Sequence, residues 1–95
     1  MSTSESTPVF IGIDVSKAHL DVAVRPQGES WQVDNTLEGI SQLVEKVRQY
    51  SPLLVILEAT GGYEAASATA LGVAGLPVAV INPRQARDFA KSLGR

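Results

Sequence analysis

The 95-residue sequence contains no cysteine, which excludes disulfide bonds and cysteine-based zinc sites. It also contains no stretch that approaches the run of about eighteen apolar residues that a membrane-spanning helix needs. Residues 1–8 are rich in serine and threonine and lack the basic start and apolar centre of a signal peptide, so we expect a disordered tail there. These absences favour a small cytoplasmic domain.

Acidic residues slightly outnumber basic ones, and the two kinds are unevenly distributed. The formal net charge of −2 argues against a domain that coats nucleic acid through bulk charge. Residues 1–64 contain nine acids and four bases, a net charge of −5, whereas residues 65–95 contain one acid and four bases, a net charge of +3. This asymmetry suggests an acidic site beside a basic rim.

Hydrophobic periodicity predicts five strands and three helices in the order βββαβαβα. Apolar or alternating runs predict strands at 9–14, 20–24, 30–35, 53–58 and 76–81. Helical spacing predicts a helix at 37–49, and an alanine-rich stretch predicts a second helix at 63–73. A third helix is expected to begin at 82–83 (Asn-Pro). We therefore expect one α/β domain over 9–95, with a mixed sheet and helices on both of its faces.

The ends of the predicted helices carry recognisable signals. Asn35 or Thr36 can cap the first helix, and Glu38 lies where a capping box would use it. Gly75 is suited to the carboxyl end of the second helix.

Two carboxylates end two of the apolar strands. Asp14 closes the first, and Glu58 closes the strand that follows the first helix. At the carboxyl end of a strand in an α/β sheet, such a group points into the crevice where ligands bind. Oxygen ligands favour magnesium or manganese over zinc, and paired metals catalyse phosphodiester chemistry. The alternative is that both acids are solvated strand ends. A third acid, Asp21, could lie near Asp14 across a hairpin, or could face solvent.

Other residues could contact phosphate or a base. Thr60 and Gly61 precede a helix whose amides could receive a phosphate, although the glycines could equally serve a backbone turn. Lys17 and the sole histidine, His19, lie in a turn where solvated roles are the simpler alternative.

Four basic residues share an arc of about 80° on the third helix, which suits phosphate-backbone contacts or a solvated face. They are Arg84, Arg87, Lys91 and Arg95. Trp31 and Phe89 could stack on a base or belong to the core.

Three ordered segments resemble the amino-terminal domain of the DEDD-type insertion-sequence transposases, which include the Piv invertase and the bridge-RNA-guided transposases. The segments are FIGIDVSK at 10–17, EATGGY at 58–63 and NPRQARDFA at 82–90. The resemblance implies a ribonuclease H-like (RuvC-like) fold and four acids that bind Mg²⁺ or Mn²⁺. Asp14 matches the first of these acids and Glu58 the second.

The resemblance also implies parts that this chain does not contain. The family's last two aspartates and its carboxyl-terminal domain, with a serine nucleophile, would lie beyond Arg95, and Asp88 is not a substitute for them. We therefore expect a truncated fragment of a DNA transposase or site-specific recombinase, inactive by itself. Its implied partners are DNA, a guide RNA and a second copy of the chain.

Two other functions fit part of the pattern. An actin-like ATPase or sugar kinase also begins with an apolar strand that ends in aspartate, but such proteins usually continue with a glycine-rich phosphate turn, and residues 15–17 (Val-Ser-Lys) contain no glycine. A non-catalytic module that binds nucleic acid or self-associates would not depend on Asp14 or Glu58.

Overall fold

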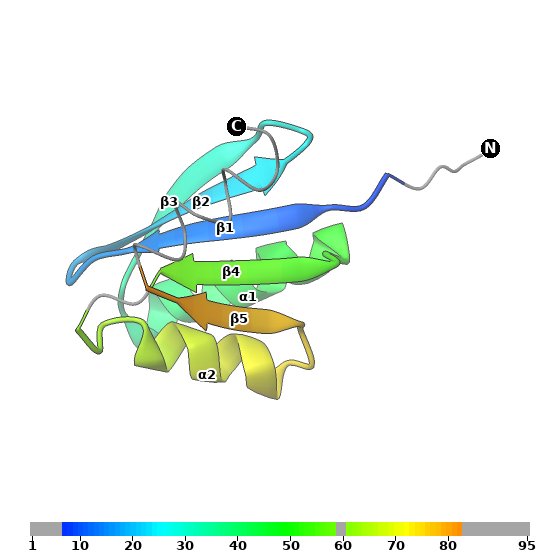
Figure 1. The fold of residues 1–95 in the computed structure, drawn as a ribbon. Helices are drawn as coiled ribbons and strands as arrows, with labels where there is room; N and C mark the ends of the chain where they lie inside the picture. Colours follow the sequence, from blue (N-terminus) through cyan, green and yellow to red (C-terminus); the bar gives the residue numbers. More distant parts are fainter. Residues whose placement is uncertain (1–6, 59–60, 83–95) are drawn as a thin grey trace.

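The computed structural model describes residues 7–58 and 61–82, which form a five-stranded sheet and two helices (Figure 1). The strands are β1 (Phe10–Val15), β2 (His19–Arg25), β3 (Ser30–Asp34), β4 (Leu54–Glu58) and β5 (Val78–Ile81). The helices are α1 (Leu37–Tyr50) and α2 (Ala65–Val73). Over the described residues, the element order agrees with the predicted one.

The sheet is mixed, with the strand order β3-β2-β1-β4-β5. The first three strands form an antiparallel meander, while β4 pairs in parallel with both β1 and β5. Because each parallel pairing needs a crossover, α1 and α2 provide the connections into and out of β4. β1 therefore lies at the centre of the sheet, where it pairs antiparallel with β2 on one side and parallel with β4 on the other.

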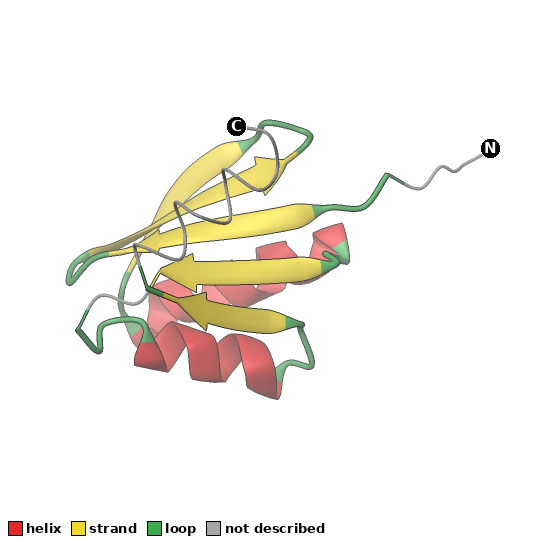
Figure 2. Ribbon diagram, in the orientation of Figure 1, coloured by secondary structure: helices red, strands yellow, loops and turns green. Residues whose placement is uncertain are grey.

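Both described helices pack on the same face of this sheet (Figure 2). Strand alternation directs apolar side chains to that face. The core combines strand residues and helix residues, all at most 5% exposed: Ile11, Ile13, Val15, Leu20, Val22, Val24, Val55 and Leu57 from the strands, and Ile40, Leu43, Val47 and Leu71 from the helices. We call the opposite face of the sheet the distal face.

Some of the predictions concern residues that lie outside the described part of the chain. The third helix would begin at Asn82 and Pro83, and Pro83 and its successors are among those residues. Helices on both faces therefore stay a prediction, since α1 and α2 share one face. The tail predicted at 1–8 falls mostly outside the described residues as well.

The start of α2 differs from its predicted position, whereas its end at Val73 is as predicted. The helix begins at Ala65 instead of residue 63, because Gly61 and Gly62 have φ values of +71° and +105° and the chain is still in a turn. At the other end, the amides of Gly75 and Leu76 donate to the carbonyls of Gly72 and Leu71. This pair of bonds is the Schellman motif, so the predicted use of Gly75 is confirmed and β5 begins at Val78 rather than at residue 76.

The start of α1 is fixed by a cap and by a glycine. Thr36 is the capping residue, and its hydroxyl accepts a hydrogen bond from the Gly39 amide at 3.1 Å. The predicted capping box of Glu38 is therefore wrong, because residue 39 occupies the position that the box requires. A Cβ atom at Gly39 would collide with the backbone carbonyl of Asp34, so glycine allows α1 to begin directly against the end of β3.

Candidate metal and nucleic-acid site

Asp14 and Glu58 lie side by side at the carboxyl ends of the two central parallel strands. Asp14 is the penultimate residue of β1 and Glu58 is the last residue of β4. The parallel register pairs Ile13 with Leu57, so the two acids occupy the next positions along neighbouring strands. Adjacent strands are about 4.8 Å apart, and both residues belong to the distal face. The fold therefore brings together the two acids that the sequence singled out.

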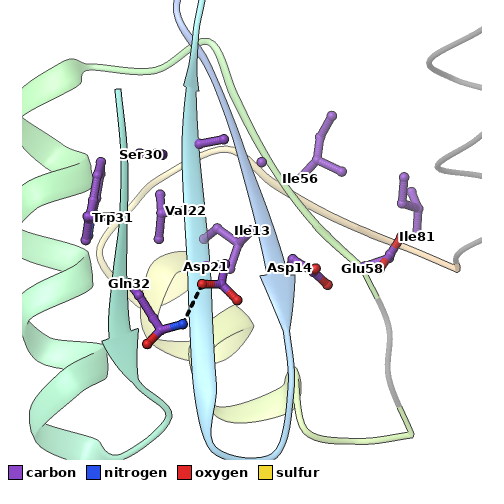
Figure 3. A pocket seen from close by; sticks show the side chains of 12 residues that line it. Ile13, Asp14, Asp21, Val22, Ser30, Trp31, Gln32, Ile56, Glu58 and Ile81 are labelled. Atoms are coloured by element: carbon purple, nitrogen blue, oxygen red, sulfur yellow. Dashed lines mark hydrogen bonds between the residues drawn. The ribbon is translucent and has the colours of Figure 1, made fainter. Parts of the chain in front are cut away.

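Asp21 extends this pair into a row of three carboxylates. It is the direct antiparallel partner of Asp14 on β2, and Figure 3 shows Asp21, Asp14 and Glu58 on three neighbouring strands. The Asp21 carboxylate also accepts a hydrogen bond from the Gln32 amide nitrogen at 2.7 Å. The open question about where Asp21 faces is thus resolved: it faces the same side as Asp14, and it already has a hydrogen-bond partner.

A pocket on the distal face surrounds these acids. Its described lining includes apolar or small residues from four neighbouring strands, namely Ala23, Gly12, Ile56 and Ile81. Asp14 is exposed and Glu58 is half-buried. Both carboxylates are therefore accessible from this pocket.

The donor chemistry of Asp14 and Glu58 suits a hard divalent cation, because both supply carboxylate oxygens. Within residues 7–58 and 61–82, no group of three or more histidine, aspartate or glutamate side chains could hold a metal ion. Asp21 therefore does not form such a group with Asp14 and Glu58. Asp14 and Glu58 are therefore two candidate ligands, which is the number that the family resemblance implies for this stretch of sequence.

The turns that follow the two acidic strands differ in how well they suit phosphate binding. Lys17 is exposed in the β1–β2 turn, where the Ser16 hydroxyl accepts from the His19 amide at 3.1 Å. After β4, Gly61 and Gly62 adopt positive φ, which supports the backbone-turn explanation for these glycines. The Gly62 amide also donates to the Glu64 carboxylate at 3.1 Å, so that amide is engaged within the protein. Thr60 lies outside the described residues.

Two of the other candidate residues have ordinary structural partners. The Nδ1 atom of His19 lies 3.7 Å from an Asp34 carboxylate oxygen. Trp31 stacks on Tyr50 with a centroid distance of 6.1 Å, and the Lys46 ammonium lies 4.2 Å from the Trp31 ring centroid. Trp31 thus packs toward α1, in agreement with the core alternative. Phe89 and the basic residues Arg84, Arg87, Lys91 and Arg95 lie outside the described part of the chain.

One residue joins the turns that follow the two acidic strands, a contact that the sequence does not indicate. Asn35 was considered only as a helix cap, but its side-chain amide donates to the carbonyl of Ser16 at 2.9 Å and to that of Tyr63 at 3.1 Å. These two carbonyls belong to the turns that follow Asp14 and Glu58. No sequence signal marks such a role, because it depends on three segments that meet only in the folded chain.

Sequence comparison decides the family. A family profile described as "Transposase", that of the DEDD transposases of the IS110 type, matches residues 11–95. The chain belongs to this transposase family. Membership implies metal-dependent catalysis and DNA binding for the family, and it confirms the resemblance found in the three ordered segments. None of the curated proteins matches the chain in sequence.

Similarity to solved structures supports the fold of this transposase domain. RuvC of T. thermophilus, in complex with a Holliday junction substrate, superposes with a TM-score of 0.67 at 17% identity, over 86% of this chain and 69% of RuvC. A non-polymerising MamK mutant bound to AMPPNP gives a TM-score of 0.51 at 9% identity, over 82% of this chain and 42% of MamK. The predicted RuvC-like, ribonuclease H-like fold is therefore confirmed.

No helix among the described residues is both long and apolar enough to cross a membrane.

Proposed function

We propose that this chain provides the first half of a divalent-metal site for DNA strand cleavage and transfer in transposition. Asp14 and Glu58 would hold Mg²⁺, or Mn²⁺ in its place, together with the two further aspartates that the family resemblance implies. A cation bound there would stabilise the negative charge that develops on the scissile phosphate and its leaving oxygen.

The observation that carries the proposal is the register of β1 and β4. Two carboxylates at equivalent positions on neighbouring parallel strands can reach the same ion, and both are accessible from the distal face. The charge distribution supports DNA as the substrate, because the acidic residues of the site are followed by a basic stretch at 65–95 with a net charge of +3. A guide RNA could use the same basic residues. We propose that the contacts with the phosphate backbone of DNA or of a guide RNA are made by seven residues, namely Lys17, Thr60, Gly61, Arg84, Arg87, Lys91 and Arg95.

Nucleotide hydrolysis is less well supported than DNA cleavage. Similarity to MamK at 9% identity extends to the fold alone. The β1–β2 turn, at residues 16–18, is Ser-Lys-Ala and contains no glycine that would let a backbone approach a nucleotide phosphate.

The proposal is tested by a DNA cleavage assay on a protein in which this domain is joined to the family's two further aspartates and its carboxyl-terminal domain. We expect Asp14→Asn and Glu58→Gln each to reduce Mg²⁺-dependent strand cleavage below detection, because each removes one ligand. Glu45→Gln is the matched control, since it removes one exposed carboxylate from α1 on the helix side of the sheet. Asp21→Asn tests the neighbouring acid of the row, and cleavage should persist.

Cleavage that survives both Asp14→Asn and Glu58→Gln would overturn the proposal. It would leave the non-catalytic alternative, in which the domain contributes binding or self-association. Loss of cleavage in Glu45→Gln as well would mean that net charge, rather than metal ligation, explains the result.

A further inference from the structure

We infer that Asn35 is a positioning residue, which holds the two turns behind Asp14 and Glu58 in a fixed relation and thereby sets the separation of the two carboxylates. The inference rests on the proposed metal site. The β1–β4 pairing ends at Ile13 and Leu57, so Asp14 and Glu58, which come next along the chain, are not paired with each other in the described ladder.

Asn35 connects three separate segments through hydrogen bonds of normal length. Its side-chain nitrogen donates to the Ser16 carbonyl at 2.9 Å and to the Tyr63 carbonyl at 3.1 Å, which uses both protons of the amide group. Its backbone amide donates to the Ala18 carbonyl at 2.9 Å. Asn35 thus binds the β1–β2 turn twice and the turn after β4 once.

These bonds lie just beyond the point where β1 and β4 stop pairing with each other, although Asp14 stays paired with Asp21 on β2 and Glu58 with Ile81 on β5. The β1–β4 pairing ends at Ile13 and Leu57, and no ladder joins β1 to β4 beyond these residues in the described part of the chain. Asp14 is two residues before Ser16, and Glu58 is five residues before Tyr63. A single side chain that bonds both turns therefore limits how far the two strand ends can separate.

Asn35 is itself held by rigid neighbours. It lies between the last residue of β3, Asp34, and the Thr36 cap of α1, and Gly39 lets the helix begin against the strand end. An anchored amide costs little conformational entropy when it makes its bonds, which is the usual arrangement for groups that support metal ligands.

The test measures local order and metal affinity separately in the 95-residue chain. Asn35→Ala removes both side-chain donors, and Asn35→Asp keeps the shape of the side chain but replaces the donating amide with a carboxylate. Gln42→Glu is the control, because it makes the same amide-to-acid change at an exposed position of α1. The readouts are amide hydrogen exchange and the Mn²⁺ concentration needed for paramagnetic broadening near Asp14.

We expect faster exchange in both turns, at 16–18 and 61–63, in the two Asn35 variants, with the core amides of β1 and β4 still protected. Mn²⁺ binding should weaken by roughly tenfold in both variants, as for other residues that support metal ligands. Gln42→Glu should change neither readout.

Three results would overturn the inference, and each is distinct. Unchanged exchange in the turns would mean that Asn35 does not hold them. Faster amide exchange in the turns with unchanged Mn²⁺ affinity would mean that Asn35 stabilises the turns but does not position the two carboxylates. Absence of Mn²⁺ binding near Asp14 in the unsubstituted chain would overturn the proposed function, and the positioning role with it, whatever the exchange rates show.

Discussion

At the scale of single residues, the contacts that matter most join positions far apart in the sequence. Asp14 and Glu58 could be selected from the sequence because each ends an apolar strand, and strand ends in α/β sheets meet at one edge. The contacts of Asn35 and the Asp21–Gln32 pair could not be selected from the sequence. The Asp21–Gln32 pair depends on the register of the β2–β3 hairpin, and the bonds of Asn35 depend on turns that meet only in the folded chain.

Gly39 gives a residue-scale prediction with an unusual sign. Alanine in place of glycine inside a helix ordinarily stabilises by up to about 1 kcal/mol. At Gly39 the new Cβ would collide with the Asp34 carbonyl, so we expect Gly39→Ala to destabilise by about 1–3 kcal/mol in chemical denaturation.

Gly72→Ala is the matched control for this prediction. Gly72 is exposed in α2, and a Cβ there would meet nothing within 4 Å, so the ordinary stabilising effect should appear. Equal effects at the two positions would contradict the close contact between α1 and the end of β3.

At the scale of secondary structure, the elements were predictable in kind and order, but their ends were less so. Period-two and helical spacing identified each described element, because burial on one face imposes those periods. The start of α2 could not be placed, because the glycine turn at 61–62 extends into residues that also fit a helix. The cap of α1 remained open between Asn35 and Thr36, because both residue types cap well.

The cap of α1 provides a prediction at this scale. Thr36→Ala removes the hydroxyl that accepts from the Gly39 amide, and we expect a loss of about 1 kcal/mol in the free energy of unfolding. Thr69→Ala, at an exposed position within α2, should be neutral or slightly stabilising because alanine is the better helix former. A loss of the same size at both positions would argue against the cap.

At the scale of the whole molecule, the apolar core and the carboxylates lie on opposite faces of the same sheet. The apolar side chains of the strands face α1 and α2, and the row of carboxylates lies on the distal face of the same strands. Alternation along β1 and β4 produces both properties at once, because successive residues point to opposite sides. The fold class could therefore be predicted from the sequence, whereas the prediction of helices on both faces concerns residues outside the described part.

The central claim, that Asp14 and Glu58 share one divalent cation, is tested most directly by titrating Mn²⁺ into the ¹⁵N-labelled chain and mapping paramagnetic broadening. The account predicts broadening centred on the amides of Asp14, Glu58 and the turn at 61–62, lost in Asp14→Asn and in Glu58→Gln but retained in Glu45→Gln. Broadening that is diffuse, centred elsewhere, or unchanged by either substitution would contradict it.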